Sequence, residues 1–347
     1  MHFEKVGDQK QIRLEQYRQL QSFIYSLAED AVSGRQPLPS GIQELQRWQS
    51  GHRKMLERVV GYPAPAAEYE PRLISQEELG SDDLVRSTRR MVIRVAEGLD
   101  VYGILLLPYR EKPRLMFCFH GGSGCPELIT SVCPSNNYND GARKFVALGF
   151  AVFAPLLVLR REETIDPDWN ENYRTAMNIN AQWAGTSVLA VELLKVERAM
   201  RFFDGCDEVD ASSIGIAGLS YGGYYALYAS ALIERTAFCV SSCYFNDRLA
   251  VMRDHPCGLL DWQYPNAGSL YGDAHLAALI CPKPLYIEVG EHDELFSPDG
   301  ARREAQSVRK VYEACGAKFL FDVFEGRHEF SLRHIAGFLN DETGERK

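Results

Sequence analysis

The fold is decided by the stretch Ile214-Gly215-Ile216-Ala217-Gly218-Leu219-Ser220-Tyr221-Gly222-Gly223-Tyr224-Tyr225-Ala226-Leu227. It opens with a short apolar, β-branched run, passes through the motif Gly-x-Ser-x-Gly, and ends in residues typical of a helix. A sharp turn from strand to helix leaves no room for side chains at Gly218 and Gly222. The stretch therefore predicts a strand, a tight turn that presents the Ser220 hydroxyl, and a helix whose first N–H groups face an oxyanion.

Short apolar runs of the length of buried strands recur on both sides of this turn. They cover residues 115–119, 150–154, 214–217, 238–241, 285–289 and 319–324. Helical patterns lie between most of them, at 140–148, 188–203, 224–232 and 301–314. Two further runs, 91–95 and 101–107, predict a hairpin around residues 97–100. Strands that alternate with helices predict the α/β class, with a mostly parallel central sheet flanked by helices.

The first part of the chain has a different pattern, so we divide the chain into two regions. Apolar residues recur every three or four positions over residues 10–31 and 42–59, which predicts two amphipathic helices separated by a break at 33–40. Residues 1–88 are thus expected to form a helical extension, and residues 89–347 a catalytic domain. We expect the extension to pack on that domain, with an oligomer contact or a wall of the active-site cleft as alternatives.

The amino-acid composition restricts the binding partners of the protein and the cellular compartment in which it is expected. The net charge is −9, and no run of five Lys or Arg residues occurs, so we expect no binding to nucleic acid or to an anionic membrane. The nine cysteines contain no Cys-x-x-Cys pair, and Cys118, Cys239 and Cys281 lie in or beside apolar runs. No signal peptide and no membrane span is recognisable. These features predict a cytoplasmic protein with reduced thiols.

Three long connections follow strands of the parallel part, at residues 121–139, 156–186 and 242–281. They should meet over the carboxyl edge of the sheet, where open α/β sheets bind ligands. Their aromatic residues are Trp169, Tyr173, Trp183, Tyr244, Phe245, Trp262, Tyr264 and Tyr271. We expect these connections to build the substrate pocket, with 242–281 as a lid or pocket insertion; the alternative is that the aromatic rings pack the loops against one another.

A serine nucleophile needs a base within hydrogen-bond reach, and the base needs an acid that orients it. The acid candidate is Asp293, which follows the apolar run 284–289, with Glu291, Glu294 and Asp299 as rivals. The base candidate is His328, which follows the last predicted strand. His292 is the other serious candidate for the base, whereas His334 lies in a predicted helix.

The oxyanion site is expected after the strand that ends at His120. Gly121 and Gly122 follow it, and glycine lets the backbone approach an acyl oxygen closely. The second donor should be the N–H of Tyr221. A phosphate-binding loop is excluded because neither Gly-x-x-x-x-Gly-Lys-Ser/Thr nor a suitably placed Gly-x-Gly-x-x-Gly is present. The pattern predicts no cofactor and no metal, because the His and Cys spacings match no zinc site.

These motifs, taken in order, resemble the α/β-hydrolase fold over residues 90–340, and the branch of dienelactone hydrolases and acetyl xylan esterases in particular. The segment 45–56 resembles a Trp-Gln helix that precedes the core in some acetyl xylan esterases of that branch. The resemblance implies a Ser220–Asp293–His328 triad and an oxyanion site made by Tyr221 with Gly121 and Gly122. The chain departs from dienelactone hydrolases themselves, which use cysteine as the nucleophile, by placing Ser220 there.

The expected activity is hydrolysis of carboxylic esters of small molecules, such as an acetylated sugar or another short-acyl ester. One alternative is a peptidase, because the motif from Gly218 to Tyr224 also resembles prolyl-oligopeptidase relatives. Those relatives usually carry a propeller, and a single blade takes about 40 residues, so the roughly ninety residues before the core cannot supply one. The other alternative is an inactive binding protein on the same fold. The sequence leaves the oligomeric state open, with a homo-oligomer as one alternative.

Overall fold

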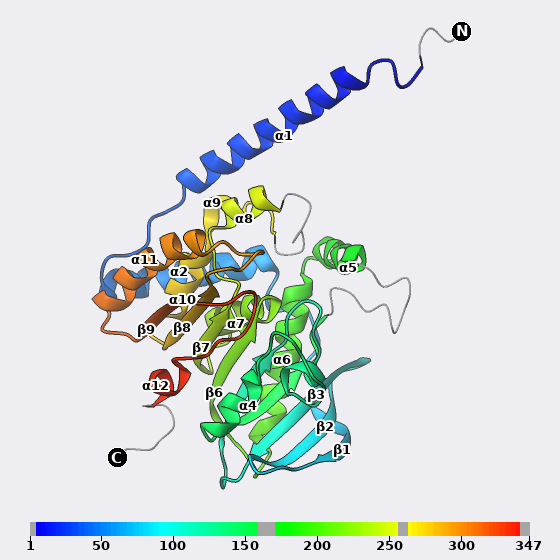
Figure 1. The fold of residues 1–347 in the computed structure, drawn as a ribbon, viewed down its shortest axis with the longest axis vertical. Coiled ribbons are helices and arrows are strands. Elements are labelled where there is room, and N and C mark those ends of the chain that lie inside the picture. Colours follow the sequence, from blue (N-terminus) through cyan, green and yellow to red (C-terminus); the bar gives the residue numbers. More distant parts are fainter. Residues whose placement is uncertain (1–4, 159–170, 256–262, 341–347) are drawn as a thin grey trace.

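A central sheet organises the molecule in the computed structural model, which describes residues 5–158, 171–255 and 263–340 (Figure 1). The sheet has nine strands in the order β1-β2-β3-β5-β4-β6-β7-β8-β9. The strands are β1 (Arg72–Gly80), β2 (Val85–Ala96), β3 (Leu99–Pro108), β4 (Arg114–Phe119), β5 (Ala151–Pro155), β6 (Asp210–Leu219), β7 (Thr236–Ser242), β8 (Leu285–Gly290) and β9 (Phe319–Phe324). Every strand that the sequence predicts is present.

Most of the sheet is parallel, as the alternation of strands and helices predicts. Strands β5, β4, β6, β7, β8 and β9 pair in parallel, whereas β1, β2 and β3 form an antiparallel edge. The predicted hairpin is the β2–β3 pair. Because the parallel strands run the same way, the ends of β4, β6, β8 and β9 lie on one edge of the sheet, and the candidate site residues follow those ends.

Helices cover both faces of the sheet. Their bounds are α1 (Lys10–Ser33), α2 (Ile42–Val60), α3 (Pro126–Ile129), α4 (Gly141–Ala147), α5 (Glu171–Trp183), α6 (Val188–Asp204), α7 (Tyr221–Leu232), α8 (Arg248–Asp254), α9 (Ala267–Leu270), α10 (Asp273–Ile280), α11 (Pro298–Ala314) and α12 (Ile335–Leu339). Apolar side chains of α2, α6, α7, α10 and α11 share one core with the sheet, and those of α3, α4 and α12 share the other. This layering buries the parallel strands on both sides.

The first 88 residues are not entirely helical, which differs from the expectation. Strand β1 and the start of β2 lie within them and extend the sheet at its edge. All but one residue of β1 are exposed, so the strand has no buried face and no alternating apolar pattern by which sequence reasoning could find it. The helical part ends with α2, where Gly61 takes the left-handed conformation with φ 69°.

The two helices of the extension differ in how they meet the body. Helix α2 buries Leu45, Trp48, Leu56 and Val60 and packs against α7 and α10, as expected for an element docked on the main domain. Helix α1 has no buried residue and projects away from the body, touching α8 and α9 near its carboxyl end (Figure 1).

Two further sequence expectations concern membranes and thiols. Within the described ranges, no helix combines the length and apolarity needed to cross a bilayer. The eight cysteines in those ranges are free, and Cys118, Cys239 and Cys281 are buried, as the apolar runs around them predict.

Candidate active site

Ser220 lies on the turn between β6 and α7 in a strained backbone conformation, with φ 59° and ψ −117°. A side chain at Gly218 would place its Cβ 2.1 Å from the carbonyl carbon of Gly222, and one at Gly222 would lie 2.0 Å from the carbonyl oxygen of Phe119. The turn therefore requires glycine at both positions, which is the local reason for the motif. The Ser220 N–H donates to the carbonyl oxygen of Ser242 at 2.8 Å, so the turn is tied to the end of β7.

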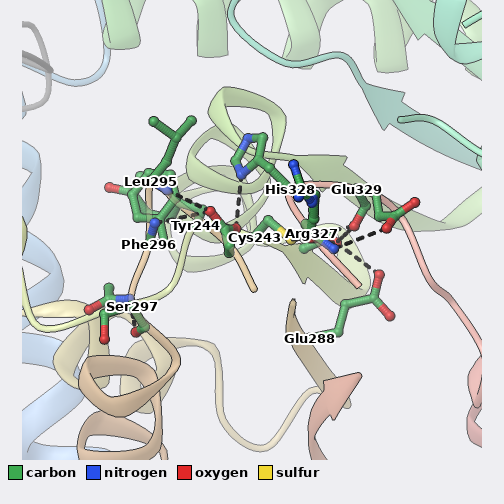
Figure 2. Close-up of polar contacts among 12 residues, drawn as sticks. Cys243, Tyr244, Glu288, Leu295, Phe296, Ser297, Arg327, His328 and Glu329 are labelled. Atoms are coloured by element: carbon green, nitrogen blue, oxygen red, sulfur yellow. Dashed lines mark hydrogen bonds and ion pairs between the residues drawn. The ribbon is translucent and has the colours of Figure 1, made fainter. Parts of the chain in front are cut away.

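His328 and Asp293 form a hydrogen-bonded pair. The His328 Nδ1 lies 2.9 Å from the Asp293 Oδ2. The other carboxylate oxygen, Oδ1, accepts the N–H groups of Leu295 at 2.8 Å and Phe296 at 3.0 Å, which fixes the carboxylate. The Asp293 side chain is fully buried, while that of His328 keeps 21% of its surface exposed. His328 stacks on the ring of Phe296, and both belong to the close-up in Figure 2.

The rival acids and the rival base lie elsewhere. Glu291 and Asp299 both pair with Arg302, and Glu294 pairs with Arg327. His292 is exposed and contacts Glu325. Of the candidates considered from the sequence, the structure thus brings Asp293 and His328 together.

The glycine loop after β4 differs in one respect from the expectation. Gly121, expected to donate to an oxyanion, instead donates its N–H to the hydroxyl of Tyr138 at 2.8 Å. The loop bends there, since the N–H of Gly124 returns to the Gly121 carbonyl at 3.0 Å. Of the two glycines expected from the sequence, Gly122 therefore remains the candidate donor beside Tyr221.

His120 holds the loop in place. Its Nε2 accepts the Leu157 N–H at 3.0 Å, so Nδ1 carries the proton and donates to the Gly121 carbonyl at 2.8 Å. Burial lowers the pKa of His120 to about 4, which keeps the ring neutral and preserves both hydrogen bonds. His120 thus joins the glycine loop to the segment that follows β5 through two hydrogen bonds.

A cavity of about 290 Å³ joins these parts. Five residues named from the sequence line it: Gly121, Gly122, Ser220, Tyr221 and His328. Asp293 lies behind His328. The other walls include Leu128, Tyr138, Leu295 and Phe296. Sequence reasoning did not identify Tyr138, because a tyrosine in a long polar connection has no distinguishing pattern.

Sequence reasoning also missed Glu288, a fully buried residue of β8. Its carboxylate accepts from the Ser242 hydroxyl at 2.8 Å and from the Tyr286 hydroxyl at 3.0 Å. It also accepts the N–H groups of Ser331 at 3.0 Å and Leu332 at 2.8 Å, just beyond His328. Burial raises the pKa of Glu288, and these four hydrogen bonds oppose the rise. An acidic residue inside an apolar strand was the signal that could have identified it.

Cys243 lies behind the acid–base pair. Its Sγ is 3.4 Å from the carbonyl oxygen of Glu329 and 3.8 Å from that of Arg327, the neighbours of His328 (Figure 2). Ligand-type atoms of Cys243, Asp293 and His328 lie within 4.8 Å of one another, which is close enough for a metal ion. Burial raises the pKa of the Cys243 thiol, which disfavours the thiolate a metal needs, and Asp293 and His328 already bond to each other. The arrangement of Cys243, Asp293 and His328 therefore suits acid–base chemistry better than it suits metal binding.

The aromatic residues of the long connections lie mainly elsewhere. Tyr244, Tyr264 and Tyr271 line a second cavity of about 270 Å³ beside α8 and α9. The hydroxyls of Tyr264 and Tyr271 pair with Tyr224 and Tyr228 of α7. Phe245 is buried, and Tyr173 and Trp183 are exposed, whereas Trp169 and Trp262 lie outside the described residues. Tyr244, Tyr264 and Tyr271 thus pack against the tyrosines of α7. It is the connection 121–139 that walls the Ser220 cavity.

This fold and site define an α/β-hydrolase: a hydroxyl on a strained turn, a histidine paired with a buried carboxylate, and backbone N–H groups around one cavity. The chain belongs to the dienelactone hydrolase family, whose model matches residues 129–343. A protein of Bacillus subtilis (strain 168) named "Putative hydrolase YtaP" is 26% identical over 121 residues, which is 34% of this chain and 40% of that protein. The match therefore covers less than half of that relative's length.

Solved structures share the fold at low identity. One is described as a "putative acetyl xylan esterase" from Bacteroides fragilis NCTC 9343, with TM-score 0.67, 16% identity, and coverage of 87% of this chain and 81% of that chain. Another is a CE15 glucuronoyl esterase from Teredinibacter turnerae T7901, with TM-score 0.63, 17% identity, and coverage of 90% of both chains. At this identity the likeness establishes the α/β-hydrolase fold.

Proposed function

We propose that this protein hydrolyses carboxylic esters of small molecules through an acyl-enzyme on Ser220. The observation that carries the proposal is the 2.9 Å hydrogen bond between His328 and Asp293 beside a cavity that Ser220 also lines. Membership of the dienelactone hydrolase family supports an ester hydrolase.

Each group has a role that follows from its position. Ser220 attacks the ester carbonyl, and the Nε2 of His328 takes the hydroxyl proton because its Nδ1 is engaged by Asp293. The N–H groups of Gly122 and Tyr221 stabilise the oxyanion. His328 then gives the proton to the leaving alcohol, and water releases the acid by the same route. Asp293 orients His328 and stabilises its positive charge.

The size and walls of the cavity favour a short acyl group. Its volume of about 290 Å³ lies near the lower end of the range for ligand pockets, about 300–1,000 Å³. Leu128 and Phe296 offer apolar contact, and Ser123 and Asn137 offer polar contact to an alcohol that carries hydroxyl groups. An acetyl ester of a sugar fits this combination.

The proposal is tested with p-nitrophenyl acetate, p-nitrophenyl esters of longer acids, acetylated sugars, and aminoacyl p-nitroanilides. We expect turnover of acetyl esters, a fall in kcat/KM as the acyl chain lengthens, and no turnover of anilides. Ser220→Ala should lower kcat by at least about 10³-fold, because only the oxyanion site and substrate binding remain. Ser230→Ala, a buried serine of α7 away from the cavity, is the matched control and should stay active.

Two outcomes would contradict this function. Turnover of anilides without esters would indicate a peptidase. A folded wild-type protein that neither turns over esters nor forms an adduct with a fluorophosphonate at Ser220 would indicate an inactive binding protein.

A further inference from the structure

Helix α1 exposes an apolar stripe that the described part of the chain leaves uncovered. Tyr17, Leu20, Ile24 and Leu27, here called the α1 stripe, are 69%, 56%, 53% and 52% exposed. Their spacing of three, four and three residues places them on one side of the helix, as in the contact face of a two-helix coiled coil. A stripe of this kind on a projecting helix marks an interaction surface.

The body of the protein holds only the carboxyl half of α1. Tyr25 donates its hydroxyl proton to the Met252 carbonyl at 3.4 Å, and Glu29 pairs with Arg253, both in α8. Between α1 and the body lies a groove of about 230 Å³, lined by Tyr17, Leu20 and Ile24 and by Met252 and Gln263. The stripe therefore forms one wall of an open groove.

Charge is distributed along α1 in the direction that destabilises an isolated helix. Lys10 and Arg13 lie in the amino-terminal half, and Glu29 and Asp30 lie near the carboxyl end. No side chain caps the amino end, and neither an acidic first turn nor a basic last turn compensates the helix dipole. A second helix running in the opposite direction would place its Asp30 beside Arg13 and its Arg13 beside Asp30.

We propose that α1 pairs antiparallel with α1 of a second copy of this chain, so that the protein is a two-fold symmetric homodimer. Parallel pairing would instead place Arg13 against Arg13 and Asp30 against Asp30, which like-charge repulsion disfavours. A self-complementary patch of this kind is what a two-fold interface requires.

The spacing of the stripe sets the register. With the two-fold axis at residue 22, Tyr17 faces Leu27 of the second copy and Leu20 faces Ile24, so that the four residues form four apolar layers. Arg13 then lies beside Asp30 of the second copy. In an antiparallel pair, a residue on one flank of these layers contacts a residue at the same heptad position in the second helix. Gln21 therefore faces Gln21 on one flank.

Sedimentation equilibrium of the full chain at micromolar concentration tests the dimer. We expect a mass twice the 39.2 kDa of one chain for the wild type. Ile24→Lys should raise the dissociation constant at least about tenfold, because it places a charge in the apolar layers. Ile12→Lys makes the same change at an exposed position of α1 outside the stripe and should leave the mass unchanged. Circular dichroism and esterase activity verify that each variant is folded.

Orientation and register are tested separately. Arg13→Asp and Asp30→Arg should each weaken the dimer, and the double variant should restore it. Gln21→Cys should form an intermolecular disulfide on oxidation, whereas Arg18→Cys, on the opposite side of α1, should not. A wild type that is a single chain at 100 µM, or a dimer that Ile24→Lys leaves intact, overturns the proposal. A cross-link through Arg18→Cys but not through Gln21→Cys overturns the antiparallel register.

Discussion

The two oxygens of the Asp293 carboxylate have different tasks. Oδ1 accepts the N–H groups of Leu295 and Phe296, and Oδ2 accepts from His328. The backbone thus sets the direction of the carboxylate, and the carboxylate sets the tautomer of the imidazole, with the proton on Nδ1. His328 can then accept a proton only at Nε2, the nitrogen that the proposed mechanism uses.

Asp293→Asn should preserve the fold and remove most of the activity. The amide oxygen can keep the two backbone hydrogen bonds, so the NH₂ group must face His328 and donate to Nδ1. The proton then moves to Nε2, which can no longer accept from Ser220. We expect kcat for p-nitrophenyl acetate to fall by about 10³–10⁴-fold with little change in thermal stability.

Asp299→Asn is the matched control, since Asp299 is an exposed rival that pairs with Arg302. A loss of kcat in Asp299→Asn equal to that in Asp293→Asn would contradict the assignment of the acid.

At the scale of elements, the site depends on contacts that join strands far apart in the sequence. Glu288 of β8 bonds to Ser242 at the end of β7 and to the segment that follows His328. The Ser242 carbonyl in turn receives the N–H of Ser220. One buried carboxylate therefore links the turn that carries Ser220 to the segment that follows His328.

Glu288→Gln should destabilise the protein although the side chains have the same shape. All four neighbours donate to the carboxylate, and an amide turns one acceptor into a donor, so at least one buried N–H or O–H loses its partner. We expect the free energy of unfolding in urea to fall by about 1–3 kcal/mol. Because the His328 loop shifts, kcat should fall more than KM rises.

Glu291→Gln, at an exposed position just past the end of β8, should change neither quantity measurably. Equal stability of Glu288→Gln and the wild type would show that the four contacts do not hold the loop.

At the scale of the whole molecule, the buried carboxyl group of Glu304 is subject to charges from both the extension and the helical layer. Glu304 of α11 accepts the N–H of Ala274 in α10 at 2.9 Å. Burial raises the pKa of Glu304 to about 7, Asp273 and Asp247 add to the rise, and Arg35 of the extension opposes it. The folded protein therefore binds this proton more tightly than the unfolded chain does.

Stability should depend on pH through Glu304. Since the pKa is raised by folding, the contribution of the protonated group is full below about pH 4.5 and is lost as the pH rises through about 7. Glu304→Gln removes this titration. We expect the unfolding free energy of the wild type, relative to the variant, to decline between pH 4.5 and pH 8, as measured by urea unfolding at several pH values.

Glu313→Gln, on the exposed side of the same helix, should instead follow the wild type at every pH. A difference between wild type and Glu304→Gln that stays constant with pH would exclude this titration.

Much of the architecture could be predicted because a buried parallel strand is recognisable from the apolar residues of its own short segment. A strand covered on both faces must be apolar throughout, and six such runs marked six strands of the sheet. Strand β1 was not predicted because its side chains are exposed and its backbone pairs with β2. The roles of the aromatic connections stayed open between pocket and packing, because a ring that packs on α7 and a ring that lines a pocket have the same local sequence.

By itself, the sequence determined the turn at Ser220, since only glycine fits at Gly218 and Gly222, and the order in which Asp293 and His328 follow their strands. The tertiary structure decided which carboxylate faces His328, that Tyr138 takes the N–H of Gly121, and that Glu288 joins the two halves of the site. The physical reason is the range of each interaction: steric limits act between neighbours in the chain, whereas hydrogen-bond partners are set by strands that meet only in the folded sheet.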